Sequence, residues 1–361
     1  MNLALALALA TLIGTHFASR TPNQEDLLAS FRDAQGFYAE GAYDQAIDQY
    51  ESVLRVQSRL LEVEKIAVLV GEDTFPVREA SAYQIGNAHS KLYSDFTRFA
   101  KDSPNPARKA ELQAEADSSF LRGVAAFRQV IDTAANQALK VQAFSRLVNL
   151  YFEADRFQNV VETAEEMIAV YPGDPRAVGG YYNRGWAYFE MKMYSRAIEA
   201  FEQLLASFPT GYQADRSLFQ IGESYQEQGE YLKAIENYLR LAERQNIEGL
   251  SEEQLKQMRR EKMAGLVDET ALELAAKAEI QVGNCFTKLG DFSAGLAAYR
   301  RVITLFGTER QLVEEAYLRM ADLYQEQGDL EQSLRTYREA IEQSNDRILR
   351  GRIQYALAER L

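Results

Sequence analysis

Two imidazoles, one thiol and many carboxylates are the groups of this sequence that could carry out acid–base or nucleophilic chemistry. His16 and His89 are its two histidines, and Cys285 is its single cysteine. One cysteine forms neither an internal disulfide nor a metal site of several thiolates. With 53 acidic residues, carboxylate pairs are expected by chance on helix surfaces. The sequence also has no glycine-rich phosphate loop, metal-ligand spacing or nucleophile elbow, so we expect no enzyme, no catalytic residues, no cofactor and no metal.

The elements that would hold these groups repeat along the chain. The clearest copy has an aromatic residue at position 4, glycine at 8, aromatics at 11, 17 and 24, a small residue at 20 and proline at 32. In that order these residues are Tyr181, Gly185, Tyr188, Tyr194, Phe201, Ala197 and Pro209. The residues at position 20 of the successive copies are Ala46, Gly123, Val160, Ala197, Ala234, Gly295 and Ser333, with a spacing of 37 residues from Gly123 to Ala234.

This period predicts an all-α superhelical solenoid of about seven antiparallel helical hairpins. Seven prolines in 361 residues agree with long uninterrupted helices. We expect regular hairpins over residues 141–245 and 271–345. His89 falls at position 11, which is usually a buried tyrosine, and Cys285 falls inside a predicted helix, so we expect both side chains to be packed in the core.

The N-terminal hairpins, over residues 27–134, are predicted to have lengthened helices. Gly86 fits position 8, but Gly123 at position 20 follows about 25 residues later than expected, with a turn over Asp102–Pro106. Before it, Val53, Val56, Leu60, Val63, Ala67 and Val70 step by three and four residues. This spacing predicts that the second helix of the first hairpin continues to Val70, as part of an elongated helical bundle.

Two further segments interrupt or end the repeats. Residues 246–270 form an insertion with a helix-starting pattern at Ser251–Gln254 and a basic cluster of Lys256, Arg259, Arg260 and Lys262. This insertion is interpreted either as a solvated helix or as a docking surface for an acidic partner. Residues 346–361 predict a C-terminal helix that caps the stack.

The first 18 residues predict a signal peptide or an apolar leader. The uncharged run Leu3–Gly14 is too short to span a membrane and matches the apolar core of a secretory signal. It lacks preceding basic residues, and cleavage after Ala18 would place His16 at the −3 position. An apolar cap on the first hairpin is the alternative.

The net charge is −13, and residues 1–19 contain no charged side chain, so the excess lies in the repeats. A surface of this sign repels phosphate backbones and attracts basic groups. We therefore expect a protein or peptide partner and no nucleic acid.

With these motifs placed, the chain resembles tetratricopeptide-repeat proteins over roughly residues 27–361. The long period and the endings Tyr171–Asp174 and Phe208–Gly211 are similar to a bacterial envelope subgroup, which includes the outer-membrane assembly protein BamD and the Tol–Pal coordinator. This resemblance implies a scaffold in the cell envelope. The lipid anchor of the lipoproteins is not implied, because no cysteine precedes Cys285.

The resemblance also implies that positions 2, 5, 9, 12 and 13 line a concave binding face. In the clearest repeat these include Tyr182, Trp186 and Phe189, a second aromatic stripe beside the structural stripe of Tyr181 and Tyr188. The other candidates on this face are Asn149, Phe152, Phe219, Glu223 and Asn284. The family's basic carboxylate clamp is not matched at Ser145, Phe219, Gln220 and Gln281. A neighbouring hairpin or the insertion could instead cover the aromatic stripe.

The sequence therefore predicts a non-enzymatic scaffold that binds a partner segment in the groove of a periplasmic or envelope-associated protein. The alternatives are a cytoplasmic adaptor or regulator and a self-assembling structural protein. Homo-oligomerisation and peripheral membrane association are left open.

Overall fold

The structure is a computed structural model that describes residues 24–56, 65–245, 271–307 and 309–343, with isolated positions in 253–260 and 350–358. The chain divides into two compact units, Met1–Met167 and Ile168–Leu361, which are described separately. The predicted leader, 1–18, lies outside the described residues, as do most of the insertion, 246–270, and of the C-terminal segment, 346–361.

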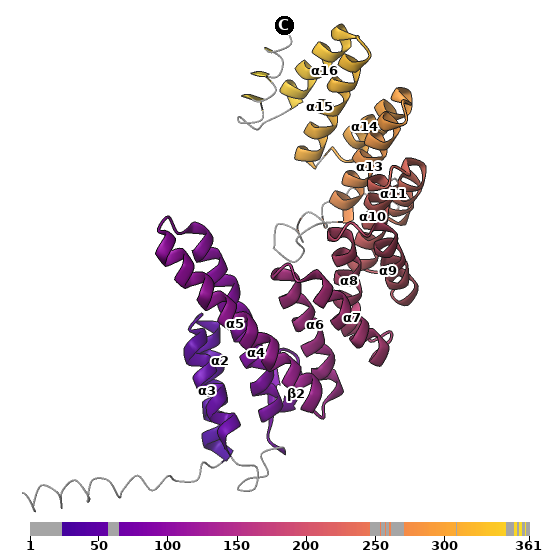
Figure 1. The fold of residues 1–361 in the computed structure, drawn as a ribbon. Helices are drawn as coiled ribbons and strands as arrows, with labels where there is room; N and C mark the ends of the chain where they lie inside the picture. Colours follow the sequence, from indigo (N-terminus) through magenta and orange to yellow (C-terminus); the bar gives the residue numbers. More distant parts are fainter. Residues whose placement is uncertain are drawn as a thin grey trace, which may run out of the picture. The chain divides into compact units, whose positions relative to one another are not determined.

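The first unit contains helices and one small sheet (Figure 1). Its elements are α2 (Gln24–Ala39), α3 (Tyr43–Arg55), β1 (Ala67–Val70), β2 (Asp73–Pro76), α4 (Val77–Asp102), α5 (Pro106–Thr133), α6 (Gln137–Glu153) and most of α7 (Phe157–Val170). Consecutive helices pack as antiparallel hairpins, α2 with α3 and α4 with α5.

The second unit is built of the short helix η2 and of hairpins in sequence order (Figure 1). Its elements are η2 (Pro175–Ala177), α8 (Val178–Glu190), α9 (Tyr194–Ser207), α10 (Tyr212–Glu227), α11 (Tyr231–Gln245), α13 (Ala271–Lys288), α14 (Phe292–Leu305), α15 (Arg310–Glu326) and α16 (Leu330–Gln343). The predicted all-α solenoid of hairpins is confirmed.

The two helices of a hairpin cross where an aromatic ring lies directly on a glycine. A Cβ atom added to Gly185 would lie 2.6 Å from Cε1 of Phe201, and one added to Gly222 would lie 2.5 Å from Cε1 of Tyr238. Real Cβ atoms essentially never come so close to another heavy atom. The same pairing of position 8 with position 24 recurs in Gly86 with Phe127 and in Gly283 with Tyr299. Position 8 therefore needs glycine where position 24 carries a ring at this distance.

In one hairpin the larger side chain lies at position 8 and the smaller one at position 24. Between α6 and α7, Val148 stands at position 8 and Ala164 at position 24, and both are fully buried. A larger side chain on the first helix is thus matched by a smaller one on the second. Such an exchange conserves the volume of the core, which costs little compared with overpacking.

The turn inside each of six hairpins depends on one residue with positive φ at position 15. This residue is Gly41, Asp155, Lys192, Gly229, Gly290 or Gly328, with φ between 53° and 79°. Glycine adopts this conformation without strain, whereas other residues pay about 1 kcal/mol or more. Asp155 and Lys192 therefore close their hairpins at a conformational cost.

The prediction that the second helix of the first hairpin continues to Val70 is wrong. Helix α3 ends at Arg55, and Ala67–Val70 forms strand β1, antiparallel to β2. Val68 lies opposite Phe75, and both are buried, while Leu69 is 59% exposed. This alternation of buried and exposed residues is that of a strand, and Gly71, with φ of +63°, makes the tight turn. The prediction failed because apolar residues of a short strand can also lie three and four residues apart, so this spacing does not distinguish a strand from a helix here.

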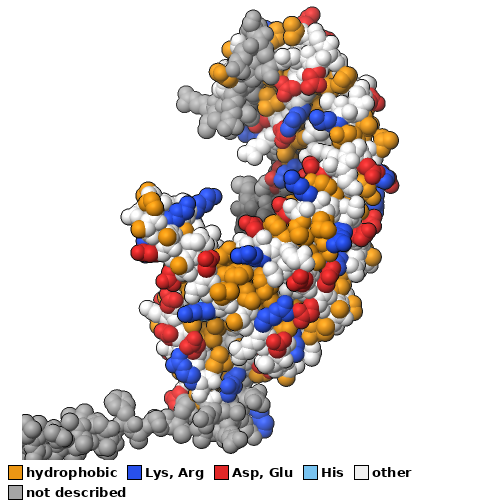
Figure 2. Space-filling view, viewed as in Figure 1, with side chains coloured by type: hydrophobic (Ala, Val, Ile, Leu, Met, Phe, Trp, Pro, Cys, Tyr) orange, Lys and Arg blue, Asp and Glu red, His pale blue; other side chains and the backbone are white. Residues whose placement is uncertain are grey.

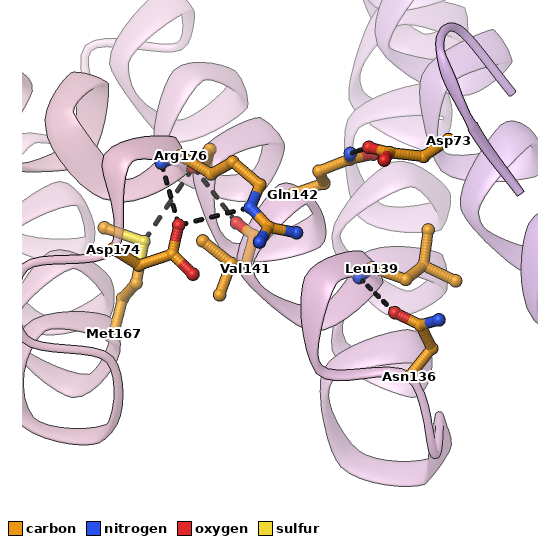
Figure 3. A network of polar contacts seen from close by, with 9 residues as sticks. Asp73, Asn136, Leu139, Val141, Gln142, Met167, Asp174 and Arg176 are labelled. Atoms are coloured by element: carbon orange, nitrogen blue, oxygen red, sulfur yellow. Dashed lines mark hydrogen bonds and ion pairs between the residues drawn. The ribbon is translucent and has the colours of Figure 1, made fainter. Parts of the chain in front are cut away.

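Side-chain hydrogen bonds hold this β-hairpin to the helices of the first unit. Gln142 of α6 donates from Nε2 to the Asp73 carboxylate at 2.9 Å (Figure 3). Gln35 of α2 donates to the carbonyl of Leu69 at 3.0 Å. Arg78, just after β2, donates to two carbonyls at the end of α3. The hairpin itself is therefore bonded to α2 and α6, and Arg78 joins the first turn of α4 to the end of α3.

The predicted turn at Asp102–Pro106 is confirmed between the long helices α4 and α5. Asn105 caps α5 by accepting from the backbone N–H of Ala107 at 3.0 Å, and Pro106 takes the first helical position. Beyond the normal repeat length the two helices enclose a narrow layer of Ala100, Leu112 and Ala116.

A pair of substitutions in α8 tests the contact between glycine and ring. We expect Gly185→Ala to lower the free energy of unfolding by about 1–3 kcal/mol, because its methyl group overlaps the Phe201 ring. Gly179→Ala, in the same helix but with no atom within 4 Å of the added Cβ, should raise it by about 0.5 kcal/mol through helix propensity. Urea unfolding followed by Trp186 fluorescence measures both, and equal effects would contradict the packing constraint.

The buried His89 is expected to make the stability of the folded protein depend on pH. It is 6% exposed, and burial together with the charge of Arg122 lowers its pKa from 6.5 to about 4. The unfolded chain therefore binds a proton between these values that the folded chain does not, so stability falls as pH drops below 6.5. We expect a loss of about 2 kcal/mol from this residue between pH 7 and pH 5.

The matched variant is His89→Phe, because the other hairpins carry aromatic residues at position 11. Urea unfolding of both proteins by circular dichroism at pH 7 and pH 5 isolates the imidazole from the carboxylates. A variant that loses as much stability as the parent would show that His89 does not cause the pH dependence.

Candidate partner-binding site

Helix α8 arranges a ladder of aromatic rings in the second unit. Tyr182 and Trp186 stack with centroids 6.2 Å apart and planes at 26°, and Trp186 and Phe189 stack at 5.7 Å and 28°. Phe189 then meets Tyr194 of α9 edge-on at 5.4 Å. The spacings of four and three residues place the first three rings on one face of the helix. The structure therefore brings the predicted aromatic stripe together.

The rings of this ladder differ in exposure. Tyr182 is only 8% exposed, because its ring packs on Phe201 at 5.6 Å and lies under the Arg216 guanidinium at 5.1 Å. Trp186 and Phe189 are half-buried. Tyr182 is thus the base of the ladder, and Trp186 and Phe189 have ring surface left for a partner. We refer to Trp186 and Phe189 as the aromatic pair.

The structural stripe on the other side of α8 also differs from expectation. Tyr181 is buried, with its ring edge-on to Phe208 at 5.3 Å. Tyr188 was expected to be buried in the same way, but it is half-buried, with the Arg196 guanidinium 5.9 Å from its ring centre. Position 11 is thus less enclosed in this repeat than the family pattern implies.

Carboxylates lie next to the aromatic ladder. The Tyr194 hydroxyl donates to Oε2 of Glu227 at the end of α10, at 3.3 Å. Glu223, one helical turn earlier, is partly buried, and this burial raises its pKa. The negative charge of Glu227 raises it further, while Gln220 and Lys277 oppose the shift. A second carboxylate held close to Glu227 favours a positively charged ligand group at this edge.

Phe219 packs against the ring at position 24 of its own hairpin. It is half-buried, and its ring packs on Tyr238 of α11 at 5.4 Å. Tyr182 and Phe201 stand in the same relation one repeat earlier. The ring at position 5 therefore completes the packing around the ring at position 24.

The polar residues at position 9 are engaged by their own hairpins. Asn284 donates to Gln281 at 2.9 Å and accepts from the Tyr299 hydroxyl at 2.7 Å. Asp322 accepts from the Tyr337 hydroxyl at 2.7 Å in the same geometry. In these two hairpins position 9 accepts from the tyrosine hydroxyl at position 24, whereas the Tyr238 hydroxyl donates to Gln226 at position 12. The predicted role of Asn284 as a peptide contact has to compete with its bonds.

The residue at position 24 bears on why a tryptophan can stand at position 9 in the α8–α9 hairpin. In the α8–α9 hairpin position 24 is Phe201, which has no hydroxyl to satisfy, and position 9 is Trp186. An apolar ring at position 9 leaves no buried polar group without a partner there. Phe127 and Ala164 also lack a hydroxyl at position 24, yet Asn87 and Asn149 stand at position 9 of their hairpins. The missing hydroxyl therefore permits a tryptophan at position 9 without requiring one.

The first unit holds a separate polar pocket. Its volume is about 90 Å³, and its lining comes from α2, α4 and α6: Tyr38, Asn87, Ser90, Lys91, Ser94, Arg146, Asn149, Leu150 and Glu153. Asn149 is exposed beside it, while Phe152 is half-buried against Phe157 at 5.7 Å. Asn87 donates to Gln84 at 2.7 Å.

Sequence reasoning missed two cations in this pocket, Lys91 and Arg146. Lys91 takes position 13, outside the clamp pattern, whereas Arg146 takes position 6, which is one of the clamp positions and was overlooked in this repeat. Arg146 donates from Nε to the Tyr83 hydroxyl at 3.3 Å. Burial raises the pKa of Glu153, and Lys91 and Arg146 oppose that shift. The pocket therefore combines two positive charges with one negative charge.

Cys285 is fully buried, and its thiol donates to Oε1 of Gln226 at 3.3 Å. Burial raises the pKa of the thiol to about 12, so it stays protonated and unreactive at neutral pH. Over the described residues, no three His, Cys, Asp or Glu side chains come together to hold a metal ion. Nor is any helix of that part long and apolar enough to cross a membrane.

Family comparison agrees with the repeat positions. Residues 178–210, 216–245 and 314–347 match three family models, each described as a tetratricopeptide repeat. The chain therefore contains tetratricopeptide repeats. The first match covers the hairpin of α8 and α9, which carries the aromatic pair. No curated protein matches the chain in sequence.

Several solved structures are similar to the chain. A tetratricopeptide-repeat protein from Parabacteroides merdae is 10% identical, with a TM-score of 0.43 over 92% of this chain and 98% of its own. MamA is 14% identical, with a TM-score of 0.40 over 56% of this chain and 91% of its own. YrrB, described as having an unusual peptide-binding site, is 16% identical, with a TM-score of 0.40 over 64% of this chain and 99% of its own.

Proposed function

We propose that this repeat protein is a non-enzymatic scaffold that binds a segment of another protein on the face of α8 and α10 in its second unit. The observation that carries the proposal is the aromatic pair, Trp186 and Phe189. Their rings are stacked, rigidly supported by the buried Tyr182, and still partly exposed. Large rings held in this way are where binding free energy concentrates in protein interfaces.

The charges beside the pair indicate the chemistry of the partner. Glu223 and Glu227 of α10 border the ladder, and the whole chain carries a net charge of −13. Acidic and basic side chains are interspersed on the visible face, without one large patch of either sign (Figure 2). A segment with an apolar or aromatic anchor and a neighbouring Lys or Arg fits this site, because its cation can contact both the carboxylates and a ring face.

We further propose that the protein works in a bacterial cell envelope. This proposal rests on the uncharged apolar run Leu3–Gly14 and on the long repeat period with its Tyr-Pro-Gly-Asp and Phe-Pro-Thr-Gly endings. An adaptor that stays in the cytoplasm and a protein that assembles with itself are the competing outcomes of the tests below.

Trp186→Ala and Phe189→Ala test the binding site. Affinity capture with the full chain first identifies a partner, and titration with the bound segment then measures affinity by calorimetry. We expect either substitution to weaken binding by tenfold or more, since anchors of this kind contribute about 2 kcal/mol or more. Raising the ionic strength should weaken binding further, because the rim is charged.

The control is Leu232→Ala, which removes an apolar side chain that is 69% exposed in the same unit but outside the site. Its affinity should equal that of the parent protein. Unchanged binding by both aromatic variants would overturn the proposed site. Loss of a homodimer in Trp186→Ala, seen by mass-resolved sizing, would instead identify a self-assembling protein.

Processing of the N-terminus tests the location. If the protein is exported, mass spectrometry of the native chain should show that it begins near residue 19, and fractionation should find it in the periplasm. A chain that keeps residues 1–18 and stays in the cytoplasmic fraction would favour the cytoplasmic adaptor.

A further inference from the structure

A second cavity lies between α11, α13 and α14, away from the aromatic pair. Its volume is about 590 Å³, within the range of about 300–1,000 Å³ that small-molecule sites occupy. Its apolar lining is Leu239 and Ala242 of α11, Val282 and Phe286 of α13, Ala294, Ala297, Ala298 and Leu305 of α14, and Phe306 just beyond it.

The repeat register shows that this lining is unusual for the chain. Ala294, Ala297 and Leu305 take positions 19, 22 and 30 of their hairpin. The matching residues of α11 are Lys233, Glu236 and Arg244, and those of α9 are Arg196, Glu199 and Ser207. Only here, among these three hairpins, are all three positions apolar. The fold itself does not require this change, because the other hairpins form with polar residues at the same places.

A buried carboxylate lies in the wall of the same cavity. Glu279 takes position 4, where the matching hairpins carry Phe144, Tyr181, Leu218 and Tyr317. Its side chain is 3% exposed, and Oε1 lies 2.9 Å from Nε of Arg301. Glu279 thus places a carboxylate in the cavity wall, at a position where the other hairpins have a large apolar or aromatic side chain. The Arg301 side chain is 49% exposed, so only the carboxylate of this pair is buried. A mostly apolar cavity with one buried charged group in its wall is typical of a ligand-binding site.

We propose that this cavity binds an amphipathic organic cation, a molecule with one protonated amine and an apolar body. The apolar body packs among Leu239, Val282 and Phe286, and the ammonium lies beside the carboxylates. The charges support this class of ligand: Glu243 and Glu279 contribute two negative charges to the lining, and Arg301 contributes one positive charge. The cavity therefore has an excess of one negative charge, in a protein that is itself acidic.

The test compares three ligands of equal chain length: octylammonium, octanoate and 1-octanol. Binding to the full chain is followed by calorimetry and by NMR of alanine methyl groups, since Ala242, Ala294, Ala297 and Ala298 line the cavity. We expect octylammonium to shift these signals and to bind at least fivefold more tightly than 1-octanol. Octanoate should bind more weakly than either.

Two variants test whether the preference for octylammonium arises in this cavity. Glu279→Gln should reduce the preference for octylammonium over 1-octanol to less than twofold. Ala297→Arg should weaken binding of all three ligands at least tenfold, and it should fold, since Arg335 takes the same position in α16. Glu199→Arg is the matched control, because it places arginine at position 22 of α9, outside the cavity, and should leave binding unchanged.

Four results would overturn the proposal, and the first three concern the ligands and variants. One is tighter binding of octanoate than of octylammonium, which would mean that Arg301 determines the ligand. Another is that no ligand shifts the four alanine signals. A further one is that Ala297→Arg and Glu199→Arg weaken ligand binding equally. If the alanine signals shift only with protein concentration, a second copy of the chain occupies the cavity, and the proposal is equally overturned. None of these outcomes depends on the aromatic pair of α8.

Discussion

The close approach of an aromatic ring to a helix backbone is the contact on which four hairpins of this protein depend. At Gly86, Gly185, Gly222 and Gly283 the ring at position 24 leaves no room for even one methyl group. This distance fixes how near the two helices lie and therefore which residues are buried around the crossing. The Val148–Ala164 pair obeys the same constraint with the volumes exchanged. Side chains at positions 5 and 9 then pack around a ring whose place is already set.

The candidate binding site follows from a small chemical change within that constraint. A tyrosine at position 24 needs an acceptor, and Asn284 and Asp322 supply it at position 9. Phe201 needs none, so Trp186 can stand at position 9 and stack with Tyr182 and Phe189. The missing hydroxyl permits this aromatic surface but does not by itself create it, because Asn87 and Asn149 keep position 9 polar in hairpins that carry Phe127 and Ala164 at position 24. The supporting helices stay in the same arrangement.

The hairpins and their order could be predicted from the sequence because each repeats the same spacing of glycine, small and aromatic residues. The β1–β2 hairpin could not, since the apolar residues from Val53 to Val70 fit a helical spacing as well as a strand. The face of the aromatic stripe was predictable, whereas the burial of Tyr182 was not, because Arg216 of the next hairpin covers it. Lys91 and Arg146 were missed because they belong to different hairpins and only the fold places them in one pocket.

The turn at Lys192 has a consequence for motion. Glycine closes the α10–α11 hairpin at Gly229, with φ of +76°, while a residue with a full side chain closes the α8–α9 hairpin with φ of 59°. The strain stored in that turn is released when α8 and α9 separate, which lowers the free energy of local opening by about 1 kcal/mol relative to a glycine turn. The hairpin with the aromatic pair therefore has a built-in bias toward transient opening, so its rings can adjust to a ligand at a lower energetic cost than a glycine-closed hairpin would allow.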